Sequence, residues 1–136
     1  MIRSDQVQAA LVSFLKANST IVAELGSSDE IREAWWHGTE FSYPAIRVRI
    51  LSMRPRGSSE HCATQGRLSV MVFDENTSSQ KCARISGIIG NELHDKSFYT
   101  SGVRLITRVE EVVPPIRQDL RTWRSEVLVE FKATSG

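Results

Sequence analysis

The sequence predicts an α+β domain in which a four-stranded, mainly antiparallel sheet carries two helices packed on one face. Two segments with helical spacing and four segments with alternating apolar and polar residues follow one another in the order α-β-β-α-β-β. Strands that are joined without a helix pair antiparallel, and the alternation leaves one sheet face apolar for the helices to cover. The 136 residues suffice for one core and contain no linker or repeat, so we expect a single domain over residues 1–136.

The first half of the chain supplies a helix and two strands. Apolar residues recur every three or four positions over residues 5–15, which predicts the first helix. Residues 20–25 predict only a short turn, and residues 27–42 have no clear period. From Pro44 the period changes to two, which predicts a strand through Ile46, Val48 and Ile50. A second strand follows over residues 67–73.

The second half repeats this order. Residues 80–93 carry an apolar stripe at helical spacing and predict the second helix. Strands are predicted over residues 103–113 and 122–133 because apolar and polar side chains alternate there. Pro114 and Pro115 stop the third strand, since proline has no N–H to donate to a neighbouring strand, and they predict a wide connection.

Composition excludes several classes of protein. The 17 Lys and Arg residues nearly balance the 16 Asp and Glu residues, and a net charge of +1 is far below that of a nonspecific nucleic-acid binder. No apolar run approaches the roughly 20 residues that cross a bilayer, so we expect no membrane contact. Residues 1–20 hold no signal-peptide core, and Cys62 and Cys82 suggest no disulfide framework. We therefore expect folding in a cytoplasm.

The sequence shows no catalytic, metal or cofactor site. Its histidines, His37, His61 and His94, lie in separate segments without metal-ligand spacing. His61 and Cys62 are adjacent, but neighbouring residues in an extended loop point in opposite directions, so they form only a weak alternative site. Cys82 falls on the apolar stripe of a predicted helix, which favours core packing. There is no nucleophile elbow and no glycine-rich phosphate loop, so we expect a protein that is not an enzyme and binds no cofactor.

Charge is distributed unevenly and suggests an interface between protein chains. Residues 1–43 carry 3 basic and 6 acidic side chains, whereas residues 44–67 carry 5 arginines and one glutamate. The acidic segment of one copy can contact the basic segment of another, although a solvated sheet face explains the arginines equally well. The long loop 54–66 predicts a functional arm, and tryptophan is common at binding hot spots. The candidate subunit or tube interface residues are Arg47, Arg49, Arg54, Arg56, Arg67 and Trp36.

The order of segments resembles that of the tail terminator proteins of long-tailed bacteriophages, which complete the tail and join it to the head. The resemblance covers nearly the whole chain. It rests on the opening helix 5–15, the entry Tyr43-Pro44-Ala45-Ile46 into the first strand, and a hairpin ending at residues 68–73. Asp74 with the helix to Leu93, and the interruption of the last two strands at residues 119–123, complete it.

This resemblance implies a structural role in a virion. Such proteins form a ring, usually of six subunits, that caps the tail tube, ends tube polymerisation and contacts the head connector or neck protein, while DNA passes through the lumen without specific binding. The expected location is the head-proximal end of the phage tail, after assembly in the host cytoplasm. Unpaired sheet edges give copies one route to extend the sheet around a ring. The alternatives are a neighbouring neck or head-closure protein, or a small ligand-binding regulatory domain, which predicts a preformed apolar pocket.

Overall fold

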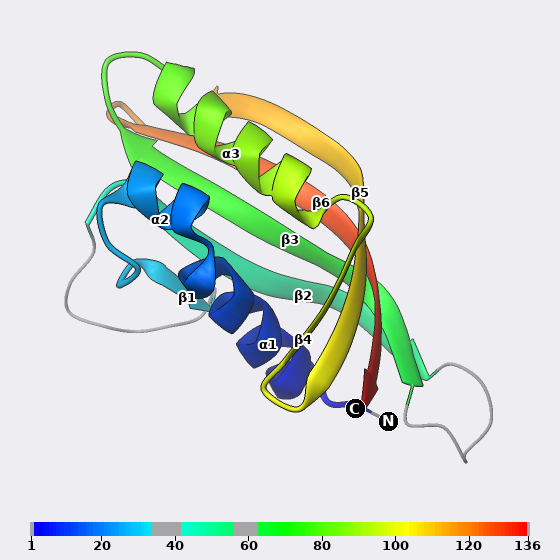
Figure 1. The fold of residues 1–136 in the computed structure, drawn as a ribbon. Helices are drawn as coiled ribbons and strands as arrows, with labels where there is room; N and C mark the ends of the chain where they lie inside the picture. The colour runs from blue at the N-terminus through cyan, green and yellow to red at the C-terminus, as the bar shows by residue number, and fades with distance from the viewer. Residues whose placement is uncertain (1, 34–41, 56–62, 136) are drawn as a thin grey trace.

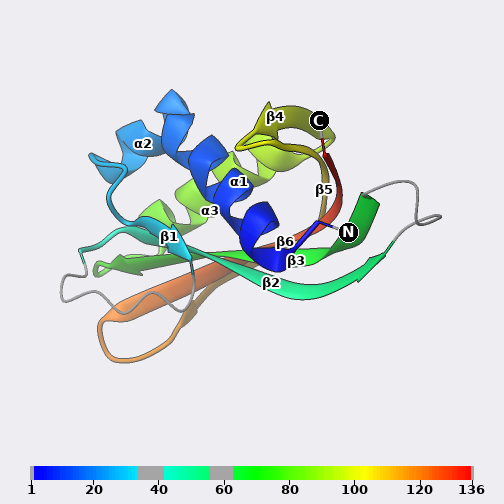
Figure 2. The ribbon, with the colours of Figure 1, turned by 90° about the horizontal axis from the view of Figure 1, so that it is seen from below.

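The chain folds into one curled sheet whose concave side is filled by helices (Figures 1 and 2). The computed structural model describes residues 2–33, 42–55 and 63–135. Over these residues it contains three helices and six strands, and the strand order in the sheet is β1-β2-β3-β6-β5-β4. The sheet is mixed, because β1 runs parallel to β2 while every other neighbouring pair is antiparallel.

The predicted four-stranded sheet with two helices is therefore wrong. The four predicted strands exist and form the antiparallel centre of the sheet as β2 (Ala45–Pro55), β3 (Ala63–Glu75), β6 (Thr122–Ser135) and β5 (Val103–Arg117). Two short strands extend it at its edges, β1 (Ile31–Glu33) and β4 (Lys96–Thr100). The third helix, α2 (Ser19–Leu25), lies where the sequence predicts only a turn.

Neither edge strand shows a period in the sequence. In β1 only Ile31 is fully buried, and its register places it beside Ile46 of β2. In β4 the apolar contact comes from Phe98, whose ring stacks on Phe14 with the two centroids 4.0 Å apart. With three residues, β1 is shorter than the four that an alternating pattern needs, and in the five-residue β4 the apolar Phe98 and Tyr99 are adjacent and do not alternate. Tertiary contacts rather than local pattern therefore define these strands.

The core lies between the concave face of the sheet and helices α1 (Ser4–Ala17) and α3 (Gln80–Leu93). Both helices bury apolar residues at helical spacing, as the sequence predicts. From α1 these are Val7, Ala10, Leu11 and Leu15, and from α3 they are Cys82, Ile85, Ile89 and Leu93. They pack against a valine-rich sheet face that includes Val48, Val70, Val72, Val127 and Val129.

Asn18 ends α1 and begins α2. Its Oδ1 accepts hydrogen bonds from the backbone N–H groups of Thr20 and Ile21, both at 3.1 Å, and so satisfies two free donors of the helix start. Its Nδ2 donates to Glu92 of α3 at 3.1 Å. Gly26 ends α2 in the left-handed conformation, with φ of 76°. The predicted turn is therefore a capped helix tied to α3.

The edge of β5 is covered by β4 only over residues 103–107. Beyond them, residues 108–117 have no strand neighbour on that side within the described part of the chain. The N–H of Val109 donates to Nδ1 of His94 at 3.3 Å. The prediction that Pro114 and Pro115 stop this strand and force a wide connection is wrong, because β5 continues through both to Arg117 and the turn to β6 spans residues 118–121. Neither proline has an N–H, and the β5 register shifts twice along this stretch. These features make the edge poorly suited to the addition of another strand.

Candidate functional site

The candidate site lies on the sheet face turned away from the helices, which we call the outer face. Along β3, Leu68 and Val70 are fully buried beneath the helices. Because side chains alternate along a strand, Arg67 and Ser69 point to the outer face. Glu126 of the neighbouring strand β6 joins them there, since its carboxylate accepts a hydrogen bond from the Ser69 hydroxyl.

A groove of about 720 Å³ crosses the outer face at right angles to the strands, and we call it the transverse groove. Two rows of side chains border it, each aligned by the register of β2, β3, β6 and β5. One row is Ser52, Arg67, Glu130 and Arg108, and the other is Arg54, Gln65, Lys132 and Ile106. Asp95, in the turn between α3 and β4, also lines it.

Positive charge predominates in the transverse groove. Its lining includes four cationic and two carboxylate side chains, which are Arg54, Arg67, Arg108, Lys132, Glu130 and Asp95. Such an excess of cations attracts an acidic surface more than a neutral one. The open, charged lining differs from the enclosed apolar pocket that a small-ligand site requires.

Neighbouring groups hold two of these cations in place. The Arg67 guanidinium donates from Nε and Nη2 to the two carboxylate oxygens of Glu110, both at 3.0 Å, and these hydrogen bonds raise the pKa of Arg67. The amide oxygen of Gln65, in its hydrogen-bonding orientation, accepts from Arg54 Nε at 2.6 Å. Within the described residues, Arg108 and Lys132 make no ion pair.

The structure brings together two of the predicted interface residues. Arg54 and Arg67 both line the transverse groove. Arg49 is exposed and lines a smaller hollow of about 300 Å³ beside the start of α1. Arg56 and Trp36 lie outside the described residues, as does most of the predicted arm.

Arg47 has an internal role that the sequence does not reveal. It is only 5% exposed, and its Nη2 lies 3.1 Å from Oε1 of Glu30, which is itself buried. Its Nη1 also donates to the Glu30 carbonyl at 2.6 Å, while the other carboxylate oxygen of Glu30 accepts from the N–H of Ser42 at 2.7 Å. Arg47 therefore joins β2 to the chain entering β1, and its burial argues against a contact with another chain.

The described residues were predicted to hold no metal site, and their side chains can be compared with that prediction. No three of their histidine, cysteine, aspartate and glutamate side chains form a group that could hold a metal ion. The core position predicted for Cys82 is confirmed: its Sγ lies 3.6 Å from the Val72 carbonyl oxygen and 3.3 Å from Ser125 Oγ, and burial raises the pKa of the thiol. His61 and Cys62 lie outside the described residues. Within the described part, no helix is both long and apolar enough to cross a bilayer.

Sequence reasoning missed several residues that the fold places at the surface sites. Arg108 and Lys132 reach the transverse groove only through the pairing of β5 with β6 and of β6 with β3. Their positions in alternating segments were the only signal in the sequence. The exposure of Leu120 was also missed. The signal for it is that this leucine stands in the otherwise polar stretch of residues 118–121.

The fold and its outer face define an α+β domain with an open, charged groove. No protein-family model matches the chain, and no curated protein matches it in sequence. Its fold is similar to that of a chain described as "Virion of native gene transfer agent (GTA) particle", with a TM-score of 0.77 and 11% identity over 97% of each chain. A second solved structure, which carries no functional description, aligns with a TM-score of 0.62 and 11% identity over 100% of this chain and 99% of the other. At such low identity, these comparisons show a shared fold.

Proposed function

We propose that this protein is a structural component of a phage-like virion and acts as its tail terminator. In this role it forms a ring, of about six copies, on the head-proximal end of the tail tube. The ring ends tube polymerisation and offers a surface to the head connector, and DNA passes through its lumen without specific binding. The described part of the chain would supply a non-enzymatic contact surface for these steps.

One observation carries this proposal: the fold likeness to a chain of a gene transfer agent virion extends over 97% of both chains. The order of segments, which resembles that of tail terminators, points in the same direction and was recognised independently of the fold. The open, charged groove supports a role in protein contacts, because interfaces between proteins combine charge complementarity with exposed surface. Arg49, Arg54 and Arg67 are the proposed contact residues, and Arg56 and Trp36 remain predictions.

A small ligand-binding regulatory domain is less well supported. It predicts an enclosed apolar pocket, whereas the transverse groove is open and bordered by charged side chains. A neighbouring neck or head-closure protein is the second candidate, since it also belongs to a virion. The two virion roles differ in what happens to the tube when the protein is missing.

The test is removal of the gene from the particle-producing genome, followed by electron microscopy of the tails. A tail terminator predicts tubes that exceed the normal length and lack heads, because nothing stops the addition of tube subunits. Restoring the protein from a plasmid should restore the length, and an antibody label should then mark the head-proximal end. Tails of normal length without heads would instead indicate a neck or head-closure protein. Normal, infectious particles would contradict any virion role.

A further inference from the structure

The hairpin that joins β5 to β6 projects from the sheet at the end opposite the chain termini (Figures 1 and 2). The two strands remain paired as far as Arg117 and Trp123. The strand β3, which pairs with β6, ends at Glu75, opposite Thr122. The turn over residues 118–121 therefore extends past the adjacent strand, and we call residues 116–124 the hairpin tip.

Hydrogen bonds hold the turn of the hairpin tip in one conformation. Oδ1 of Asp119 accepts from the backbone N–H groups of Arg121 and Thr122, both at 2.9 Å. The N–H of Gln118 donates to the Thr122 carbonyl at 2.8 Å. The backbone hydrogen bonds lower the pKa of the Asp119 carboxyl, so the group is ionised and capping the turn at neutral pH.

The base of the hairpin tip is fixed to the rest of the molecule through Trp123. The Arg117 guanidinium lies over the Trp123 ring, with its central carbon 4.9 Å from the ring centroid. The indole Nε1 donates to the carbonyl of Asn76, in the turn before α3, at 3.0 Å. A partner that binds this tip has little conformational entropy to remove, because the turn and its base are already ordered.

The ordered tip presents apolar side chains to solvent. Leu120 is 89% exposed, the highest value for a large apolar residue in the described part of the chain, and Ile116 is 49% exposed. A single exposed leucine is common on soluble proteins. Here the exposed leucine stands at the end of a rigid projection, where a pocket on another molecule can bury it and gain the full hydrophobic free energy.

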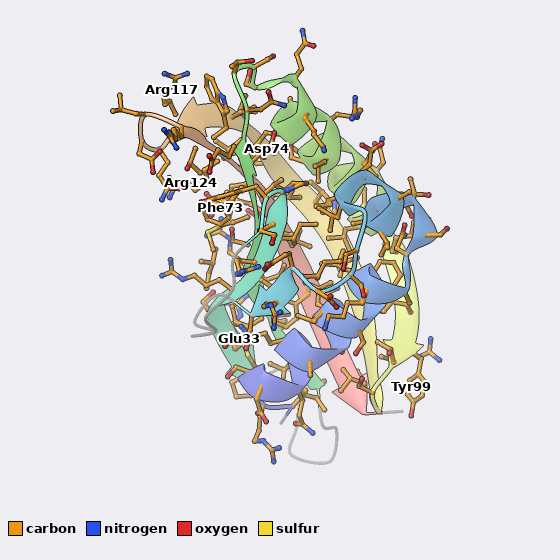
Figure 3. All side chains as sticks on the ribbon, turned by 90° about the vertical axis from the view of Figure 1, so that its left-hand side faces the viewer. Glu33, Phe73, Asp74, Tyr99, Arg117 and Arg124 are labelled. Atoms are coloured by element: carbon orange, nitrogen blue, oxygen red, sulfur yellow. The ribbon has the colours of Figure 1, made fainter. Side chains whose placement is uncertain are left out.

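The charges around Leu120 indicate what kind of pocket fits. The tip carries the cations Arg117, Arg121 and Arg124, and its only carboxylate, Asp119, is occupied by the turn. Within the described residues these three arginines make no ion pair. Figure 3 shows Arg117 and Arg124 at this end of the molecule. The complementary surface is an apolar pocket bordered by carboxylates.

On a second copy of this chain, the two hollows described above do not fit the tip. The transverse groove is bordered by Arg54 and Arg67, and the smaller hollow by Arg49, so both would repel the tip. Nucleic acid suits the arginines but gains nothing from an exposed leucine, because phosphate contacts are electrostatic. A different protein therefore fits the tip best.

We propose that the hairpin tip docks each subunit onto the end of the tail tube by inserting Leu120 into an apolar, carboxylate-bordered pocket of the tube protein. This inference rests on the proposed function. In this proposal the tip of each subunit faces the tube along its axis, and the outer face is left for contacts with lateral neighbours.

Co-sedimentation with purified tail tubes that lack this protein tests the tip. Leu120→Asp places a charge in the pocket, and Leu120→Ser and Arg121→Glu remove the apolar and the electrostatic contact separately. We expect each variant to bind tubes at least tenfold more weakly than the wild type, with unchanged melting temperature and self-association. Tyr99→Ser is the matched control, because Tyr99 is 56% exposed on another element, and it should bind like the wild type.

The outcomes separate this inference from the proposed function. Wild-type binding that survives Leu120→Asp and Leu120→Ser would overturn the tip and leave the tail-terminator role intact. A wild type that binds no tubes would overturn both. Variants that lose self-association or connector binding but keep tube binding would show that the tip meets another partner. If the wild type binds a DNA fragment and Arg121→Glu loses that binding but still binds tubes, the tip is assigned to nucleic acid. Contact of the tip with another protein partner and contact with nucleic acid would each overturn the proposal.

Discussion

The buried ion pair between Glu30 and Arg47 fixes how the chain enters the sheet. Both residues are less than 10% exposed, and Glu30 accepts hydrogen bonds from Arg47 and from the N–H of Ser42. A buried pair of this kind is costly to break, because the remaining charge loses its partner while it stays out of water. The pair therefore holds β1 beside β2 more firmly than three residues of strand could do alone.

Arg47→Met should lower the free energy of unfolding by about 3 kcal/mol. The variant removes the nearer cation and its hydrogen bonds from the buried Glu30, which keeps only Arg32, with Nε 3.7 Å from its carboxylate. Urea unfolding followed by circular dichroism measures the change. Arg108→Met, at an exposed position without an ion pair in the described residues, should change stability by less than about 0.5 kcal/mol. Equal effects of the two variants would show that burial of the pair is unimportant.

At the scale of elements, an irregularity in β2 is matched to a glycine in β3. The register between these strands shifts between Ile50 and Ser52, and Gly66 lies opposite Met53 just beyond the shift. A Cβ added to Gly66 would stand 2.1 Å from the carbonyl oxygen of Ser52, which is backbone and cannot rotate away. Only glycine permits this close approach of the two strands, which also form the floor of the transverse groove.

Gly66→Ala should therefore destabilise the fold by about 3 kcal/mol, since the strands must separate to admit the methyl group. Gly87→Ala is the matched control, because no heavy atom lies within 4 Å of its added Cβ and the residue is exposed on α3. Alanine should stabilise that helix by up to about 1 kcal/mol. Thermal unfolding measures the stability of both variants, and we expect the melting temperature to fall for Gly66→Ala and to rise for Gly87→Ala. An unchanged melting temperature for Gly66→Ala would mean that β2 can move away from β3 at little cost.

At the scale of the whole molecule, charged side chains are distributed differently in the first segment and on the outer face. Several acidic residues among the first 43 form ion pairs within the same chain, such as Glu24 with Arg84 and Glu30 with Arg47. These pairs weaken the expected attraction between the acidic first segment of one copy and the basic hairpin of another. Arg108 and Lys132, which make no ion pair in the described residues, instead line the transverse groove. We therefore expect the groove to form lateral contacts in the proposed ring.

The double variant Arg108→Glu/Lys132→Glu should reduce the fraction of tails that carry a ring at least tenfold, because it reverses the sign of the groove. Rings should also dissociate more readily as salt concentration rises, since charges on an open surface are screened. Counting rings on tails by electron microscopy measures both effects. Lys96→Glu, at an exposed position on β4 outside the groove lining, should assemble normally. Normal assembly of the double variant would exclude the groove from the ring contacts.

Local pattern in the sequence determined the central elements of this protein. The helices α1 and α3 and the strands β2, β3, β5 and β6 each repeat an apolar position often enough to reveal their period. The core position of Cys82 and the presence of arginines on a polar sheet face followed from the same periods. Their order also resembles that of a virion component.

Only the tertiary structure decided how these elements close into one molecule. It added β1 and β4 at the edges, buried Arg47 against Glu30, and placed Lys132 and Arg108 beside Arg54 and Arg67. Each of these features joins residues far apart in the chain through strand register or burial. Periodicity reports only which side of its own element a residue occupies, so it cannot report which distant residue will lie opposite.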